Sequence, residues 1–148
     1  MVWGGISLRH RTPLVRIDGT LTGMTYRDNV LGPFVLPALQ VIGPGAIFQD
    51  DNARPHRAHV VTAFEQAHNI DHMEWPAQSP DLSPIEHMWD FVGRQVRENY
   101  PHAANVYELF NQLQQEWQAV PHQRIQRLRS MRQRCLECIQ AHGGHTRY

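Results

Sequence analysis

Residues 46–52 read Ala-Ile-Phe-Gln-Asp-Asp-Asn, an apolar run that ends in two carboxylates and an amide. A short, continuous apolar segment that follows the turn formers Gly-Pro-Gly at residues 43–45 is typical of a strand buried on both faces. Side chains alternate along a strand, so Asp50 and Asp51 are expected to point to opposite faces. Only one of the two carboxylates can therefore face a site at the end of the strand.

Glu86 follows Asp51 after 34 intervening residues and closes the stretch Ser-Pro-Ile-Glu at residues 83–86. Proline suits a first helical position, so a helix is expected to begin here. A carboxylate at the tip of a strand and another at the head of a helix packed on the same sheet can converge on one point. Carboxylates are the ligands that hard divalent cations prefer, so Asp51 and Glu86 predict a metal site for phosphodiester chemistry.

Each acid also has a purely structural explanation. Residues 83–86 fit a capping box, in which the glutamate bonds back to the helix start, and Asp51 fits a turn aspartate. Neither explanation accounts for both acids at this spacing. Asn52 leaves two roles open, one as a helix cap and one as an orienting partner of Asp51.

Length and charge limit the classes of protein. The chain has 148 residues, of which 41% are hydrophobic, so a single domain with one core is expected. A net charge of zero argues against a chain that is basic all over and coats nucleic acid. Lysine is absent, and arginines gather near the C-terminus at Arg124, Arg127, Arg129, Arg132 and Arg134. They fit either phosphate contacts or a solvated helix face.

Several other functions lack their signatures. No signal peptide and no apolar run of about 20 residues is present, so an intracellular protein without membrane spans is expected. Cys135 and Cys138 provide neither a disulfide framework nor a zinc site and are expected to be ordinary helix residues. His56 and His59 are spaced for joint metal ligation but have no evident third ligand. Neither a nucleophile elbow nor a glycine-rich phosphate loop occurs.

The pattern before residue 46 predicts a hairpin and a helix. Residues 1–8 and 14–21 have the apolar and β-branched content of two strands joined by a polar turn. Residues 24–42 carry apolar side chains at helical intervals, but Gly32, Pro33 and Pro37 interrupt them. We expect this helix in two pieces.

Strands and helices alternate after residue 46. A helix from Pro55 to about residue 69, a short strand over residues 70–75, a loop over 76–84 and a helix over 85–99 are expected. This alternation implies parallel pairing between the strands at 46–51 and 70–75. Residues 106–120 and 124–142 predict further helices, the second with a break near residues 130–131. Trp75 and Trp89 flank the acidic loop and fit either walls of the site or core packing.

Four segments together carry a family resemblance. Residues 2–7 (Val-Trp-Gly-Gly-Ile-Ser), 48–56, 75–86 and the ending 143–148 (Gly-Gly-His-Thr-Arg-Tyr) resemble the catalytic domain of Tc/mariner-superfamily DNA transposases, in the Tc-like branch. In that family two Asp residues and a third acid bind two metal ions. The resemblance matches Asp51 to the second acid and Glu86 to the third. Asp50 departs from the family pattern, which more often has Gln there.

The resemblance implies an α/β fold with a ribonuclease H-like mixed sheet flanked by helices. The core would cover about residues 1–100 and extra C-terminal helices about residues 104–142 of one partial catalytic domain over residues 1–148. The family's first Asp lies on a central strand just upstream of the segment that begins here at Met1, so this strand is expected to be missing. We therefore expect the hairpin to be detached from residues 46–51 or shifted inward to pair with them.

The resemblance also implies a function and partners. It implies Mg²⁺-dependent cleavage and strand transfer of transposon-end DNA in the nucleus, with two ions held by Asp51 and Glu86 and with Mn²⁺ as an alternative metal. DNA is the implied partner, at transposon ends and target; Arg124, Arg127, Arg132 and His56 are candidate DNA contacts. A homodimer is compatible, and no membrane or small-molecule substrate is implied. A catalytically inactive remnant that binds DNA or a partner protein is the alternative.

Overall fold

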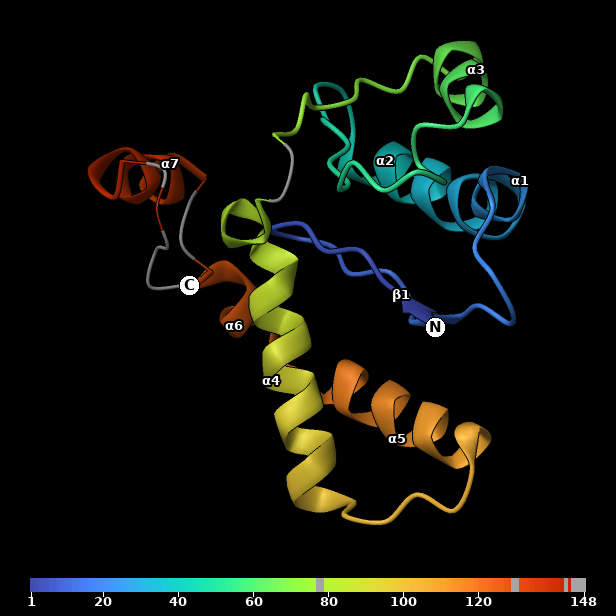
Figure 1. Ribbon diagram of the computed structural model, residues 1–148, viewed down its shortest axis with the longest axis vertical. Helices are drawn as coiled ribbons and strands as arrows, with labels where there is room; N and C mark the ends of the chain where they lie inside the picture. The colour runs from blue at the N-terminus through green and yellow to red at the C-terminus, as the bar shows by residue number, and fades with distance from the viewer. Residues whose placement is uncertain (77–78, 129–130, 143, 145–148) are drawn as a thin grey trace. The chain divides into compact units, whose positions relative to one another are not determined.

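The computed structural model describes residues 1–76, 79–128, 131–142 and 144, with the backbone alone at Met131. The chain forms two compact units, Met1–Gln78 and Ser79–Tyr148 (Figure 1). This division places the helix that follows residue 83 with the C-terminal helices, whereas the sequence grouped it with the sheet. Among the described residues, no helix is both long and apolar enough to cross a lipid bilayer.

The first unit opens with the predicted hairpin. Strands β1 (Val2–Trp3) and β2 (Val15–Arg16) pair antiparallel, with Val2 opposite Arg16 and Trp3 opposite Val15. Between them the Thr12 side chain replaces a ladder bond, because its Oγ1 accepts from the Gly5 N–H at 2.8 Å. The regular strands are therefore shorter than residues 1–8 and 14–21.

A continuous helical run follows the hairpin. It comprises α1 (Gly23–Tyr26), the π-helix η1 (Arg27–Val35) and α2 (Leu36–Ile42). The prediction of two separate pieces was wrong, because the wider π-helical turn accommodates Pro33, which has no N–H to donate. The N–H of Leu36 bonds to the carbonyl of Leu31, five residues back, which is the π pattern.

The predicted parallel pairing is present as a single bridge. Phe48 pairs with His72: the Phe48 N–H donates to Asp71 O and the Met73 N–H donates to Phe48 O, each at 2.7 Å. Within the described residues the hairpin pairs only with itself, so it is detached from residues 46–51, one of the two expected arrangements. Residues 46–51 and 70–75 are thus extended, but they do not form full strands.

The core of the first unit lies between the helical run and α3 (His59–Ala67). Its buried members are Ile17, Tyr26, Val30, Leu31, Val35 and Val61, and Trp3 and Phe48 pack against them. Helix α3 begins at His59, later than the predicted start at Pro55, because Pro55 lies in turns that precede the helix. Gly23 permits close contact between α1 and the start of α3, since a Cβ atom there would lie 2.4 Å from the Ala58 Cβ.

The second unit is helical. The 3₁₀ turn η2 (Pro80–Leu82) leads into α4 (Pro84–Asn99), followed by α5 (Val106–Ala119), α6 (His122–Gln126) and α7 (Met131–Gln140). One face of α4 is buried, and Trp89 stacks on Trp117 of α5 with ring centroids 5.1 Å apart. This stacking supports core packing for Trp89. The predicted break near residues 130–131 falls partly outside the described residues.

Candidate functional site

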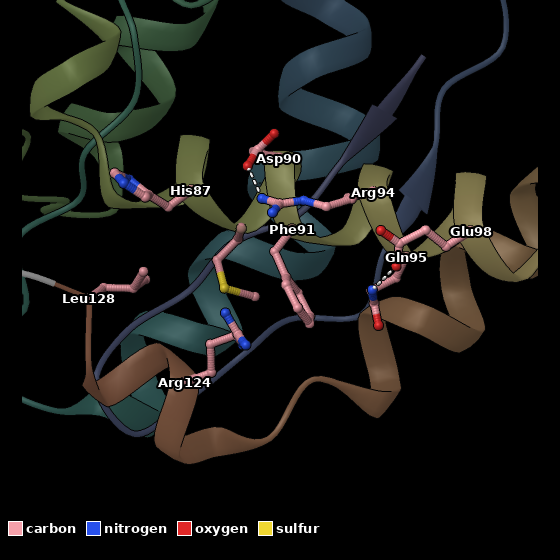
Figure 2. Close-up of a pocket in the computed structure, with 9 residues that line it drawn as sticks. His87, Asp90, Phe91, Arg94, Gln95, Glu98, Arg124 and Leu128 are labelled. Carbon is pink, nitrogen blue, oxygen red and sulfur yellow. Dashed lines mark hydrogen bonds and ion pairs between the residues drawn. The ribbon is translucent and has the colours of Figure 1, made fainter. Parts of the chain in front are cut away.

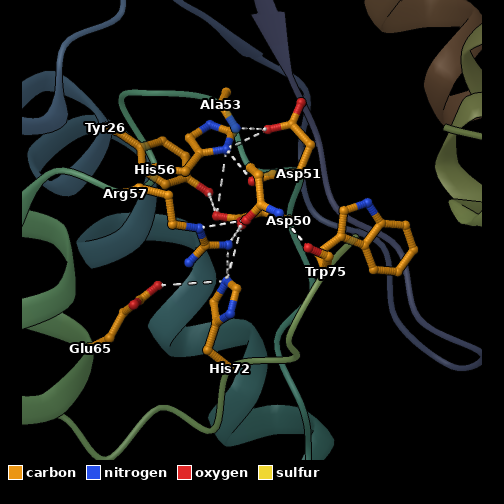
Figure 3. A network of polar contacts seen from close by, with 10 residues as sticks. Tyr26, Asp50, Asp51, Ala53, His56, Arg57, Glu65, His72 and Trp75 are labelled. Carbon is orange, nitrogen blue, oxygen red and sulfur yellow. Dashed lines mark hydrogen bonds and ion pairs between the residues drawn. The ribbon is translucent and has the colours of Figure 1, made fainter. Parts of the chain in front are cut away.

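Asp51 stands exposed at the end of the extended segment and is held by two contacts. Its side chain is 69% exposed, its Oδ1 accepts from the Ala53 N–H at 3.0 Å, and the same oxygen lies 2.7 Å from His56 Nδ1 (Figure 3). His56 in turn stacks on Tyr26, with ring centroids 4.1 Å apart. The carboxylate therefore faces solvent in a fixed direction.

Asp50 points the other way, as strand alternation predicts. Its side chain is only 7% exposed and bonds Tyr26 Oη at 3.1 Å, Arg57 Nη2 at 2.7 Å and His72 Nε2 at 3.0 Å (Figure 3). Burial, and next the negative charge of Asp50, raise the pKa of Tyr26, so its hydroxyl keeps the proton that it donates. The buried hydrogen bonds of Asp50 thus hold the end of segment 46–51 in place.

Asp50, Glu65 and His72 also have the spacing of metal ligands. One potential ligand atom from each lies within 4.8 Å of the others, and the buried Glu65 Oε1 has no hydrogen-bond partner among the described residues. However, Arg57 Nη2 already lies 2.7 Å from Asp50 Oδ1 and 3.1 Å from His72 Nε2. A guanidinium therefore occupies the place of a cation, and the group fits a buried polar network better than a metal site.

Asn52 ties the segment to its neighbours. Its side-chain amide donates to the carbonyl oxygen of Trp75, and its Oδ1 accepts from Arg57 Nε at 2.9 Å. The N-cap of α3 is Ala58, so Asn52 does not cap that helix. Arg57 consequently donates hydrogen bonds to Asp50 and Asn52, the two residues next to Asp51.

Glu86 lies exposed in the first turn of α4. Ser83 is the N-cap of this helix, but its side chain makes no capping hydrogen bond, so the capping box that the sequence allowed is not formed. Because Asp51 and Glu86 belong to different compact units, their convergence stays a prediction.

The arginines of the C-terminal helices differ in exposure. Arg124, Arg127 and Arg132 are exposed, and the Arg124 guanidinium lies 3.8 Å from the centre of the Phe91 ring. Arg134, by contrast, is 1% exposed and cannot belong to an open arginine-rich face. Cys135 and Cys138 are free thiols on α7, as expected. His56, a candidate DNA contact, lies against Asp51, and its contact with DNA stays a prediction.

A pocket of about 360 Å³ opens between α4 and α6 (Figure 2). Its lining mixes apolar Met88 and Phe91 with charged groups. Two of these charges neutralise each other, since Arg94 pairs with Asp90 at 2.5 Å. The pocket offers no arrangement that indicates a particular ligand.

The model of one protein family matches residues 1–109, under the description DDE superfamily endonuclease. The chain belongs to the DDE superfamily of endonucleases. Within this superfamily it is similar to the Tcb2 transposase of Caenorhabditis briggsae, at 39% identity, and to the Tc1 transposase of Caenorhabditis elegans, at 37%. Each match covers 100% of this chain and 54% of the relative. The DDE chain thus spans about half the length of these curated relatives.

Solved structures agree on the fold of this DDE chain. The catalytic domain of Mos1 mariner transposase matches with a TM-score of 0.75 and 18% identity, over 98% of this chain and 81% of that one. The Mos1 catalytic domain with raltegravir and Mg matches at 0.74 and 21%, over 89% and 68%. The Mos1 paired-end complex with its left transposon end matches at 0.72 and 21%, over 90% and 40%. The predicted resemblance and the ribonuclease H-like fold class are confirmed.

Sequence reasoning located the two acids but missed the residues around them. Tyr26, Arg57, Glu65 and His72 come from separate segments and meet only when α3 packs on the helical run. The adjacent Asp50 and Asp51 were the available signal, because the buried member of such a pair needs polar partners.

Proposed function

We propose that this chain is the catalytic part of a transposase that cleaves transposon-end DNA and joins it to target DNA. The observation that carries the proposal is Asp51 itself, exposed at the end of its segment and fixed by His56 and the Ala53 N–H. Glu86 supports it, because it is a carboxylate exposed in the first turn of α4. Membership of the DDE superfamily of endonucleases supports a shared role of these two acids as metal ligands.

Asp51 and Glu86 would both serve as carboxylate ligands to two divalent ions. Carboxylates fit Mg²⁺, and Mn²⁺ would substitute. When bound, the two metal ions would stabilise the attacking and leaving oxygens during phosphodiester displacement. His56 would keep the Asp51 carboxylate in one orientation, so that little motion is lost when the metals bind.

The partner would be DNA, and the nucleus the site of action. The exposed Arg124, Arg127 and Arg132 would contact phosphates, which position the duplex without reading its sequence. The structure of Mos1 transposase with its transposon end supports DNA as the class of partner. We propose in addition that the chain can form a homodimer.

Nicking and joining of labelled transposon-end DNA test the proposal. The protein assayed is the longest gene product that contains this chain, with Mg²⁺ or Mn²⁺ present. We expect Asp51→Asn and Glu86→Gln to abolish both steps, because each removes a charged ligand. The matched controls Asp18→Asn and Asp90→Asn remove exposed carboxylates of the same two units and should leave activity intact. Undiminished cleavage in the Asp51 and Glu86 variants would overturn the proposed function of these acids, whereas a parent that binds DNA without cleaving it would favour a remnant that only binds.

A further inference from the structure

Arg134 of α7 is buried against the segment that leads into α4. Only 1% of the residue is exposed. Its Nη1 donates to the backbone carbonyl of Asp81 at 2.6 Å, and its Nη2 lies 3.0 Å from Nδ1 of His87. All three residues lie within the second unit. Arg134 is 53 positions from Asp81 and 47 positions from His87 in the sequence.

The chemistry of these contacts allows one arrangement. A guanidinium is always protonated and only donates, so His87 Nδ1 must be the acceptor. The imidazole is then neutral, with its hydrogen on Nε2. Charge-assisted bonds of this kind are about twice as strong as neutral ones. The buried guanidinium needs these hydrogen bonds, because an unpaired buried charge would strongly destabilise the fold.

The two residues that Arg134 contacts lie on either side of Glu86 in the sequence. Asp81 lies in η2, just before α4, and His87 directly follows Glu86 in the first turn. The start of a helix has free N–H groups and frays unless something caps it, and the Ser83 side chain does not. One side chain from α7 therefore holds both segments that flank Glu86.

We propose that Arg134 is a positioning residue for Glu86. Through the Asp81 carbonyl and the His87 ring it fixes the first turn of α4, and thereby the direction in which Glu86 presents its carboxylate. The inference rests on the proposed function, since it takes Glu86 to be a metal ligand. It assigns a role in the site to α7, which lies beyond the residues 1–109 that the family model matches.

The test compares substitutions at Arg134 and His87 in the nicking assay. Loss of an outer partner of a metal ligand costs roughly 10- to 100-fold in metal affinity or activity. We expect Arg134→Gln to raise the Mg²⁺ concentration for half-maximal nicking by about tenfold on that scale, with DNA affinity unchanged. Arg97→Gln is the matched control, because it removes an exposed arginine from the far end of α4.

A second pair of variants isolates the hydrogen bond from overall stability. The Oδ1 of Asn stands close to Nδ1 of a histidine, whereas the amide of Gln stands close to Nε2. His87→Asn should therefore keep the Mg²⁺ dependence near that of the parent, and His87→Gln should shift it as Arg134→Gln does. This pair decides the matter even if the Arg134 variant fails to fold.

The outcomes separate the inference from the function beneath it. Cleavage that survives Glu86→Gln overturns the proposed function and the inference with it. If Glu86→Gln abolishes cleavage while Arg134→Gln and His87→Gln keep the parent Mg²⁺ dependence, the function stands and Arg134 has no positioning role. In the parent, nitrogen NMR should find the His87 hydrogen on Nε2; a hydrogen on Nδ1 would contradict the contact.

Discussion

His56 is one of the two groups that fix the direction of Asp51. His56 Nδ1 lies 2.7 Å from Asp51 Oδ1 and is kept in place by stacking on Tyr26. We predict that His56→Ala raises the Mg²⁺ concentration for half-maximal nicking by roughly 10- to 100-fold, since an outer partner of a ligand is lost. His56→Asn keeps a polar group near the same place and should lose less.

The same variants test the DNA role that the sequence suggested for His56. Affinity for transposon-end DNA is measured without metal, and Mg²⁺ dependence is measured separately. A fall in DNA affinity with unchanged Mg²⁺ dependence would mean that His56 contacts DNA and does not orient Asp51.

Glu65 makes stability depend on pH. Burial, opposed in part by the charge of His72, raises the pKa of Glu65 above its ordinary value of 4.5. Between that value and the raised one the folded state binds more protons than the unfolded state, so stability falls as pH rises through this window. Glu65→Gln removes the loss and should raise the melting temperature near neutral pH.

The pH profile of this difference is the decisive measurement. Melting temperatures of parent and Glu65→Gln are compared from about pH 4, where both states of the parent tend to be protonated, to about pH 8. The advantage of the variant should be smallest at the acid end and grow as pH rises. An advantage that instead grows toward acid pH would contradict the raised pKa.

Single residues differ in how far the sequence reveals them. The positions of Asp51 after an extended segment and of Glu86 in a first helical turn could be predicted, because local sequence marks both places. Their shared role stays a prediction. The partners of Asp50 could not, because Tyr26, Arg57 and His72 meet only through tertiary packing. Arg134 was grouped with the exposed arginines, since no local pattern distinguishes a buried guanidinium from its neighbours.

At the scale of elements, the contact between α1 and α3 depends on Gly23. A Cβ atom there would lie 2.4 Å from the Ala58 Cβ, so the two helices must separate. Overpacking of this kind costs about 1 to 3 kcal/mol, and Gly23→Ala should destabilise the fold by that amount. Urea unfolding followed by circular dichroism measures the change.

Gly32→Ala is the matched control for that prediction. The added Cβ would lie 3.5 Å from the Arg27 carbonyl oxygen, an ordinary contact, and alanine favours helix by about 1 kcal/mol. This variant should be neutral or stabilised. Equal destabilisation by both substitutions would place the cost in the helix itself and not in the contact with α3.

Helices were predicted better than strands. Apolar periodicity located α4 and α5 almost to their ends, because amphipathic faces are a local property. The π-helix was missed, since the same prolines that end an α-helix can be absorbed by a wider turn. The segments at 46–51 and 70–75 have strand composition, yet pairing depends on neighbours and only one bridge forms.

At the scale of the whole molecule, the chain is expected to associate. Residues 46–51 make one backbone bridge, and Ile47 within them is 57% exposed. Extended apolar segments with unpaired backbone groups pair with other chains. We predict that the purified chain is oligomeric or poorly soluble in size-exclusion chromatography with light scattering. A monomer with a sharp unfolding transition at high temperature would contradict this.

The central claim is that Asp51 and Glu86 share one pair of metal ions. A crystal structure of the chain with Mn²⁺, using anomalous scattering to locate the ions, tests it most directly. We predict Mn²⁺ peaks in contact with both carboxylates, at oxygen distances of about 2 Å, and none in the Asp51→Asn variant. Carboxylates separated by more than about 10 Å, or ions bound to one acid without the other, would contradict a two-metal site.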